Sequence, residues 1–326
     1  MKILFLFRKK ASFIQTDIDI LRTKHEVRTL QVNYGWRSLP STFRNYVNGT
    51  LWADVLFSWF GSHHAVFPFL FASGMNKPCI TVASGFDTAN APEIQYGDMR
   101  PGWRRPLGIA VYKMSQRILA VSNFTASEIK KNIPIDQNKV TTIHHGFNVQ
   151  SLPDLNNKKD IVLSIGGINK SNLIRKGIEI FVRSASFLPS VDFKLIGCWE
   201  DDAINDLKSF APSNVQFTGY LENISHYLSI SKVYAQPSYH EAFGCSVAEA
   251  MLQRCIPVVT NRASLPEVVG DTGFYVPYDN PQKIAMGIRE AINSGPKERE
   301  RARQRIIDEF PIEKRSRHIL RIIDEL

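Results

Sequence analysis

Short apolar runs typical of β-strands alternate with amphipathic, helix-like segments along almost the whole chain. Several of these runs are continuously apolar, as in strands of a parallel sheet that is covered on both faces. Alternation of strands with helices favours βαβ units and therefore an α/β fold. The predicted strands cover residues 2–7, 25–32, 53–60, 78–84, 117–122, 139–147, 160–166, 192–197, 215–219, 232–238 and 256–261.

Some helical segments carry recognisable start and stop signals. Residues 123–132 hold Thr125 and Glu128 at the spacing of a capping box, which predicts a helix start at Thr125. Two charged amphipathic helices are expected at the end of the chain, within residues 297–326. Pro311 lies between them and is expected to break the helix there.

A polar, turn-rich stretch at residues 144–160 predicts a linker between two domains. A chain of 326 residues has room for two domains of roughly 150 residues each. We therefore predict an N-terminal domain over residues 1–152 and a C-terminal domain over residues 153–310. The last helix, residues 311–326, is expected to return to the N-terminal domain.

The charged residues are unevenly distributed. The first 150 residues hold 18 of the 40 Lys and Arg and 9 of the 31 Asp and Glu, a net charge of +9, whereas the remainder is balanced. This asymmetry favours an anionic partner for the N-terminal half, such as a membrane surface, a phosphorylated acceptor or a nucleic acid. A solvated basic surface is the alternative.

Cysteine usage and apolar segments indicate the compartment. Four cysteines without C-x-x-C spacing favour neither a zinc site nor a disulfide framework, and they fit a reducing compartment. Residues 1–7 are too short a run for a signal peptide and precede basic residues. The best apolar window, residues 65–72, is far below the ~20 residues of a membrane span. We predict a cytoplasmic protein, soluble or peripheral at the inner face of the membrane.

Two familiar kinds of motif are misplaced or missing. Asp17 and Asp19 mimic a D-x-D metal motif, but they lie in an early amphipathic helix, where we expect a solvated face. No G-x-G-x-x-G follows the first predicted strand, and the sequence contains no P-loop. These absences weaken the case for a dehydrogenase and for a nucleotidase.

The most informative stretch begins at Pro237, where a predicted strand leads through a loop into a helix. Gly244 permits a tight turn, and the free N–H groups at the start of the following helix favour an anion. Glu241 precedes this turn and Glu249 lies one turn into the helix. Acids on both sides of an anion cradle suit a nucleotide sugar, which has hydroxyls at both ends and a diphosphate between. An ordinary helix start with two solvated glutamates is the alternative.

This stretch resembles the E-x7-E motif of retaining GT-B glycosyltransferases, specifically glycosyltransferase family 4 (glycosyl transferases group 1). Its continuation, "IPVVTNRASLPEVVGDTGFYVPYDN", resembles the pattern that follows in that family, with Cys255 where glycine is common. The segments "LAVSNFTASEIKKN", "IHHGFN", "LSIGGINKSNLIRKGIEIFVRS" and "FTGYLENISHYLSISKVYAQPS" are similar to other family motifs in the same order. The resemblance covers residues 118–326 well and the first hundred residues weakly. It implies a GT-B architecture, with two Rossmann-like domains whose parallel sheets face a cleft.

The resemblance also implies roles for the charged residues. Lys176 would neutralise the donor diphosphate as a point charge, with Arg175 assisting. Glu249 would bind the ribose hydroxyls. Glu241 would hold the transferred sugar and support positive charge at its anomeric carbon.

Further donor contacts are implied around these charges. The family often has an arginine where this chain has Gly167, and Arg175 or Lys170 is a candidate replacement. Tyr220 and Leu221 would line the base pocket, although a core tyrosine is equally consistent with the sequence. The remaining implied donor-side residues are Gly166, Phe243, Gly244, Cys245 and Ser246.

The acceptor side is less well marked. Many family members have a histidine near the acceptor where this chain reads "SGFD". The resemblance implies that Asp87, the acidic residue of this segment, lies on the acceptor side. A turn aspartate that caps a helix is the alternative. His63 and His64 follow a predicted strand and either line the cleft or serve as structural histidines. Residues 100–117 combine basic and apolar side chains, which suits an interfacial membrane patch or a solvated helix beside the acceptor groove.

The resemblance implies a hexosyltransferase-type enzyme (EC 2.4) that is metal-independent, needs no cofactor and uses a UDP- or GDP-linked sugar. The acceptor would be a glycan, a lipid-linked molecule or a phosphorylated molecule, and no nucleic acid is expected. Two alternatives remain open. One is a GT-B sugar-nucleotide epimerase, and the other is a non-catalytic module that binds a sugar nucleotide or a nucleic acid.

Overall fold

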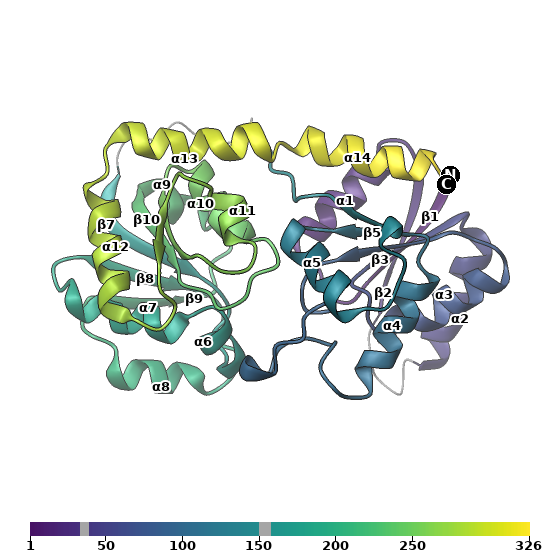
Figure 1. Ribbon diagram of the computed structural model, residues 1–326, viewed down its shortest axis with the longest axis horizontal. Helices are drawn as coiled ribbons and strands as arrows, with labels where there is room; N and C mark the ends of the chain where they lie inside the picture. Colours follow the sequence, from purple (N-terminus) through teal and green to yellow (C-terminus); the bar gives the residue numbers. More distant parts are fainter. Residues whose placement is uncertain (33–38, 150–157) are drawn as a thin grey trace. The chain divides into compact units, whose positions relative to one another are not determined.

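The computed structural model of the protein describes residues 1–32, 39–149 and 158–326 (Figure 1). The chain divides into two compact units. Met1–Gly146 together with Ile312–Leu326 form the first unit, and Phe147–Pro311 form the second. The domain boundary predicted at residue 152 lies outside the described residues.

The first unit is built on a six-stranded parallel sheet with the order β2-β1-β3-β4-β5-β6. Because β1 pairs with both β2 and β3, the direction of winding reverses between β1 and β3. The strands are β1 (Lys2–Phe7), β2 (Glu26–Gln31), β3 (Val55–Trp59), β4 (Cys79–Ala83), β5 (Arg117–Ala120) and β6 (Val140–Thr142).

Helices cover both faces of this sheet. Helices α2, α3 and α4 pack side by side on one face, and α1 packs against α14 on the other. Ile3, Phe5 and Phe57 are among the fully buried side chains of the central strands. The helices are α1 (Ser12–Arg22), α2 (Leu39–Trp52), α3 (Val66–Gly74), α4 (Arg104–Met114), α5 (Asn123–Asn132) and α14 (Ile312–Asp324), with 3-10 turns η2 (His63–Ala65), η3 (Pro92–Ile94) and η4 (Gln137–Lys139).

The second unit contains another six-stranded parallel sheet, with the order β12-β11-β10-β7-β8-β9. Here β7 lies between β8 and β10, so the winding reverses between β7 and β10. The strands are β7 (Lys159–Ile165), β8 (Asp192–Ile196), β9 (Val215–Gly219), β10 (Ser231–Gln236), β11 (Ile256–Thr260) and β12 (Phe274–Val276).

Helices α7 and α12 pack together on one side of this second sheet, while α10 packs against α11 and α13 on the other. The apolar face of α7 is buried, with Phe181 and Val182 fully enclosed. The helices are α6 (Lys170–Arg175), α7 (Ile178–Ser184), α8 (Ala203–Phe210), α9 (Ser225–Ile230), α10 (Cys245–Leu252), α11 (Leu265–Val269), α12 (Pro281–Asn293) and α13 (Pro296–Glu309), with the 3-10 turn η5 (Ala185–Phe187).

Several local expectations need correction. Ser122, not Thr125, caps α5, because the Ser122 hydroxyl accepts the backbone N–H of Thr125 at 3.0 Å. Asp17 is fully buried rather than solvated. The structure also adds β12, a three-residue strand that the apolar pattern did not predict. Within the described residues, no helix combines the length and apolarity needed to cross a bilayer.

Candidate functional site

Two loops of the second unit meet at the carboxyl ends of β7 and β10. The loop after β7 leads through α6 to Lys176, and the loop after β10 contains Glu241. These strands are neighbours, and the winding of the sheet reverses between them. Open α/β sheets bind their ligands at this kind of position, outside the carboxyl ends of the strands.

Gly177 lets the two loops approach closely. Its φ of 67° lies in the left-handed region, which glycine adopts without strain. A Cβ atom at this position would lie 2.1 Å from the carbonyl oxygen of Pro237, so no larger residue fits without moving the backbone. The backbone N–H of Tyr239 donates to the carbonyl of Arg175 at 2.8 Å and joins the loops. The Lys-Gly pair thereby brings Lys176 next to the loop after β10.

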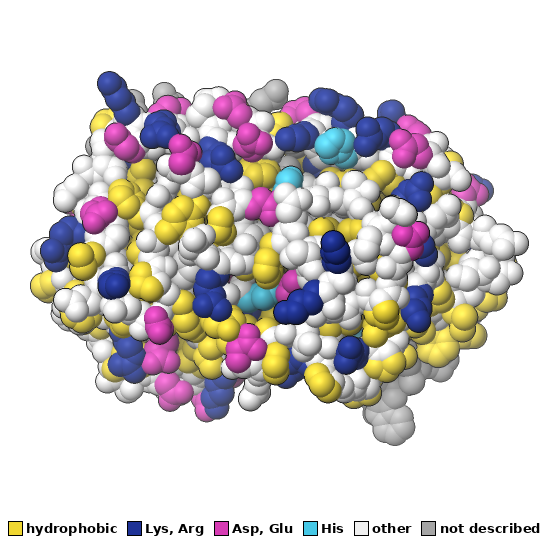
Figure 2. Space-filling view, in the orientation of Figure 1, with side chains coloured by type: hydrophobic (Ala, Val, Ile, Leu, Met, Phe, Trp, Pro, Cys, Tyr) yellow, Lys and Arg dark blue, Asp and Glu magenta, His cyan; other side chains and the backbone are white. Residues whose placement is uncertain are grey.

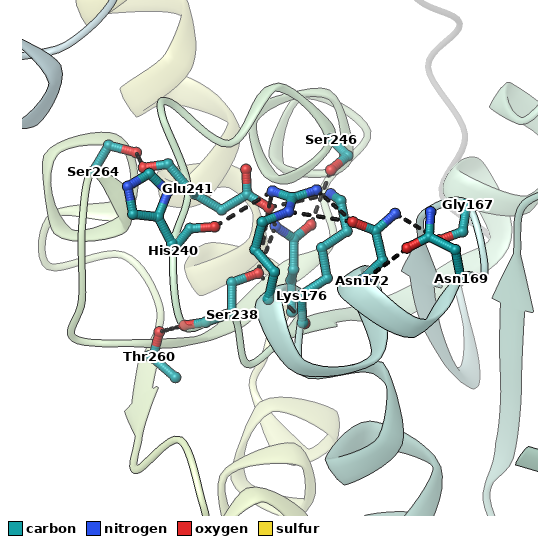
Figure 3. A network of polar contacts seen from close by, with 12 residues as sticks. Gly167, Asn169, Asn172, Lys176, Ser238, His240, Glu241, Ser246, Thr260 and Ser264 are labelled. Atoms are coloured by element: carbon teal, nitrogen blue, oxygen red, sulfur yellow. Dashed lines mark hydrogen bonds and ion pairs between the residues drawn. The ribbon is translucent and has the colours of Figure 1, made fainter. Parts of the chain in front are cut away.

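Glu241 pairs with two cations at this junction (Figure 3). Its Oε1 atom lies 3.1 Å from Nζ of Lys176 and 3.7 Å from Nη1 of Arg175. Burial alone would raise the pKa of Glu241, but the charges of Lys176 and Arg175 outweigh this effect and hold the pKa below its ordinary value. One carboxylate and two cations leave the cluster with a net positive charge.

Buried polar side chains hold Glu241 in place (Figure 3). The Gln236 side chain is buried, and its Nε2 donates to Oε1 of Glu241 at 2.8 Å. The Oε1 atom of Gln236 accepts hydrogen bonds from the hydroxyl of Tyr234 at 2.8 Å and from the hydroxyl of Ser246 at 2.9 Å. Ser238 donates a further hydrogen bond to Oε1 of Glu241 at 3.3 Å. Because every donor converges on Oε1, the Oε2 atom makes no hydrogen bond within the described part of the chain.

Helix α10 begins beside this cluster. Gly244 precedes the helix with φ of 99°, which only glycine adopts readily, and no side chain caps the helix start. Ser246 uses its hydroxyl on Gln236. The start of a helix carries a partial positive charge, and Lys176 adds a full one nearby. Both features favour an anionic group at this place.

Glu249, on α10, is a half-buried carboxyl group. Its carboxylate makes no ion pair or hydrogen bond within residues 1–32, 39–149 and 158–326. Burial raises its pKa to about 7. A ligand hydroxyl that donates to this carboxylate would favour its charged form, so the group is suited to binding a sugar diol.

In the loop after β7, Asn172 links Arg175 to Gly167, the position where the family that the sequence resembles often has an arginine. Asn172 donates from Nδ2 to the carbonyl oxygen of Gly167 at 2.8 Å, and its Oδ1 accepts from Nη2 of Arg175 at 2.8 Å. Lys170, the other candidate replacement, instead pairs with Asp202 at 2.9 Å on the exposed surface. Of the two candidate replacements, Arg175 and not Lys170 lies in the Glu241 cluster.

The other implied donor-side residues lie in different surroundings. Tyr220 follows β9 and is 71% exposed, which excludes a core tyrosine, and Leu221 is partly buried beside it. Gly166 leaves room for Lys176, because a Cβ atom there would lie 2.8 Å from Cδ of the lysine. The Phe243 ring is buried near Phe147 and Phe310, so the side chain anchors the loop.

Asp87 is buried rather than open to an acceptor. Its carboxylate accepts hydrogen bonds from the backbone N–H of Gly61 at 2.7 Å, from the hydroxyl of Tyr112 at 2.6 Å and from the backbone N–H of Ser84 at 3.1 Å. Burial raises its pKa to about 6, although these hydrogen bonds oppose the rise. Asp87 therefore does not cap a helix, which was the alternative; its carboxylate instead links the segments that follow β3 and β4.

The two histidines also differ from the expected pair. His64 is buried, its Nε2 lies 3.2 Å from Oγ of Ser58, and burial lowers its pKa to about 3. His63 is partly exposed and meets the ring of Trp103 edge-on at 5.4 Å. Burial lowers the pKa of His63 as well, and the charge of Arg8 adds to this effect. Only His63 has a partly accessible side chain.

A cavity of about 650 Å³ lies at the carboxyl ends of β1, β2 and β3 in the first unit. It is at the reversal of winding between β1 and β3, where an open α/β sheet binds ligands. Two cations and two aromatic rings contribute to its wall. The lining residues are Arg8, Lys9, Gln31, Val32, Phe60, Ser62 and Phe86.

The residues that position the site are hard to predict from the sequence. Gln236, Ser238 and Asn172 hold the charged groups, yet none was singled out from the sequence. One feature of the sequence points to Gln236, since it is a polar residue directly after the apolar residues 233–235 of β10. Such a residue is buried only when its amide is fully hydrogen-bonded.

Comparison with known proteins identifies relatives of the second unit and neighbours in fold. The sequence model of the family described as Glycosyl transferases group 1 matches residues 151–308. O-antigen chain mannosyltransferase B of Escherichia coli is 27% identical over 198 residues, which are 54% of this chain and 51% of that protein. Serotype-specific mannosyltransferase WbdA of Escherichia coli is 26% identical over 198 residues, or 52% of this chain and 24% of that protein. The chain thus spans about half or less of the length of these curated relatives.

Solved structures match the whole chain. HepE from Anabaena, in complex with UDP and glucose, superposes with a TM-score of 0.81 at 16% identity, covering 100% of both chains. A glycosyltransferase from Rickettsia africae gives a TM-score of 0.75 at 17% identity, covering 99% of this chain and 98% of that one. At such identities the likeness establishes the fold. The chain therefore has the GT-B fold, and its residues 151–308 match the glycosyl transferases group 1 family.

Proposed function

We propose that this chain is a retaining glycosyltransferase that moves a hexose from a nucleotide diphosphate sugar to an acceptor. The observation that carries the proposal is the pairing of Glu241 with Lys176 and Arg175 beside the start of α10. The diphosphate would lie against Lys176 and the N–H groups of α10, and the ribose hydroxyls would donate to Glu249. The sugar would then lie near Oε2 of Glu241.

In the proposed reaction, the bond between the anomeric carbon and the diphosphate oxygen breaks. The acceptor hydroxyl forms the new bond on the same face of the sugar, and its proton passes to the departing diphosphate. Lys176 and the start of α10 stabilise the negative charge on the leaving group. Glu241 stabilises the positive charge that develops at the anomeric carbon. No protein side chain is required as a base.

The relatives narrow the donors to test. The HepE structure contains UDP and glucose, and the Escherichia coli relatives are mannosyltransferases. We therefore propose a UDP- or GDP-linked glucose or mannose as the donor. Because Lys176 and Arg175 already supply positive charge, we also propose that no metal is needed, so that excess chelator leaves the rate unchanged.

The acceptor would bind in the cavity of the first unit that Arg8 and Lys9 help to line. Cations beside the rings of Phe60 and Phe86 suit an acceptor with a phosphate or carboxylate next to an apolar or sugar moiety. The charge imbalance of the chain further supports peripheral association with an anionic membrane surface.

The test is a panel of UDP- and GDP-linked hexoses, read by thermal shift and by release of the nucleoside diphosphate. We expect one donor to raise the melting temperature and to be hydrolysed slowly without an acceptor. Three results would contradict the proposal. They are a lack of response to every donor, binding without release even when candidate acceptors are added, and conversion of the donor sugar to its epimer.

A further inference from the structure

One surface of the first unit is apolar where surface helices are usually polar. Helix α3 buries Phe69 on its inner face, yet it also exposes Phe67 (63%), Leu70 (61%) and Phe71 (40%). The spacing of these three residues places them on one face of the helix. A helix that is apolar all round is normally enclosed by protein or lipid.

Helix α2 extends this surface. Phe43 and Leu51 on α2 are 58% and 54% exposed. Met75, the residue after α3, is 37% exposed. Figure 2 shows the hydrophobic side chains gathered over α2 and α3. Between the two helices lies a groove of about 460 Å³, whose lining includes no charged side chain among the described residues. The lining residues are Phe43, Tyr46, Val47, Phe67, Leu70, Phe71, Gly74 and Met75.

The helices that form and flank this surface contribute only positively charged side chains. Helix α4 packs against α3 and contributes Arg104, Arg105 and Lys113, and α2 contributes Arg44. Helices α2, α3 and α4 contain no Asp or Glu. Trp103, at the start of α4, is 63% exposed. Exposed Phe, Leu and Trp beside Lys and Arg are typical of helices that lie in the interface of an anionic bilayer.

We propose that the outer face of α2 and α3 docks on an anionic lipid bilayer. Phe43, Phe67, Leu70 and Phe71 would enter the boundary between head groups and acyl chains, and Arg44, Arg105 and Lys113 would contact lipid phosphates. An anionic bilayer fits better than a second copy of this chain, because a second copy would bring the same cations to the contact and repel them. The inference rests on the membrane association included in the proposed function, and it assigns that association to these residues.

Vesicle co-sedimentation tests the proposal, with vesicles of phosphatidylcholine containing 30% phosphatidylglycerol, in the absence of sugar donors. We expect the intact chain to bind these vesicles, to bind pure phosphatidylcholine more weakly, and to lose affinity as salt rises. The double variant Phe67→Ser/Leu70→Ser should bind roughly tenfold or more weakly, since each side chain gives up apolar burial in the interface. The charge variant Arg105→Gln/Lys113→Gln should bind roughly 30-fold more weakly, at about 1 kcal/mol for each of the two cations.

Matched controls lie in the second unit. Met286 is 53% exposed on α12, and Arg289 is exposed on the same helix. Met286→Ser and Arg289→Gln should bind vesicles like the unchanged chain. Each variant's melting temperature and donor-induced thermal shift report whether it remains folded.

Three results would overturn the inference. They are no binding of the intact chain to anionic vesicles at low salt, equal binding by the Phe67→Ser/Leu70→Ser variant, and a dimer of the intact chain that this variant abolishes. The last result would assign the face to a second copy. Because no sugar donor is present, failure here leaves the glycosyltransferase proposal untouched. Failure of nucleoside diphosphate release, in turn, leaves vesicle binding unaffected.

Discussion

Arg315 and Asp17 are 298 positions apart in the sequence and form a buried, bidentate ion pair in the first unit. Nε and Nη2 of Arg315 each lie 2.7 Å from a carboxylate oxygen of Asp17. Trp59 donates a third hydrogen bond to this carboxylate at 3.0 Å, and Nη1 of Arg315 donates to the carbonyl oxygens of Ile143 and His144. These contacts fasten the last helix, α14, to the first unit.

We predict that Arg315→Met destabilises the chain by about 3–5 kcal/mol, because it leaves the Asp17 carboxylate buried without its partner. Denaturant unfolding measures this change. Arg317 lies exposed on the same helix, and Arg317→Met should alter the free energy of unfolding by less than about 0.5 kcal/mol. Equal stability of the two variants would show that the ion pair does not hold α14.

Lys176 is expected to act on the leaving group. Lys176→Met should lower kcat for sugar transfer about 10²- to 10³-fold, since it removes the ammonium group closest to the proposed diphosphate position. Steady-state assays with the best donor measure this loss. Lys170→Met is the control, because Lys170 is exposed and pairs with Asp202. Comparable losses in both variants would contradict the assignment of Lys176.

Glu249 should make donor binding depend on pH. Burial raises the pKa of its free carboxyl group to about 7, and hydrogen bonds from the donor's hydroxyls favour the charged form. Donor binding should therefore release a proton, so affinity rises as the pH increases through about 7 and levels off above it. Calorimetry from pH 6 to pH 8.5 measures the effect. Glu249→Gln should bind the donor more weakly and without this rise; an unchanged pH profile in that variant would refute the role.

Gln236 is expected to be a positioning residue. Gln236→Met removes the amide that links Glu241 with Ser246, so Glu241 should lose its orientation. We predict that kcat falls about 10- to 100-fold while KM changes little. Gln304→Met, on the exposed face of α13, is the control. If the loss of kcat in Gln236→Met equals the loss of folded protein in that variant, Gln236 has a structural role and does not position Glu241.

Much of the fold could be predicted from the sequence, because the predicted strands are apolar runs bounded by turns. β12 was missed because three residues are too few for a periodic pattern. The cap of α5 was misplaced because Ser122 and Thr125 both suit a helix start, and only the backbone decides between them. Asp17 was expected in solvent because its partner, Arg315, lies at the other end of the chain.

The charged centre of the site could be predicted, but its supporting contacts could not. Glu241 belongs to the E-x7-E motif and Lys176 to a separate family-like segment, and their side chains meet at 3.1 Å. Asp87 and His64 are polar residues near the ends of strands, as acceptor ligands would be, and only their burial identifies them as structural. Arg8 and Lys9 line the cavity of the first unit, yet in the sequence they are ordinary basic residues after a strand.

The most direct test of the account is the release of nucleoside diphosphate by Glu241→Gln, measured beside donor affinity. We predict that release falls about 100-fold or more, because the carboxylate that supports the anomeric carbon is lost. Donor affinity should be kept or increased, since Lys176 and Arg175 then face the diphosphate without a counter-charge. Release at the rate of the unchanged chain, with the donor bound and the fold intact, would contradict the catalytic role of Glu241.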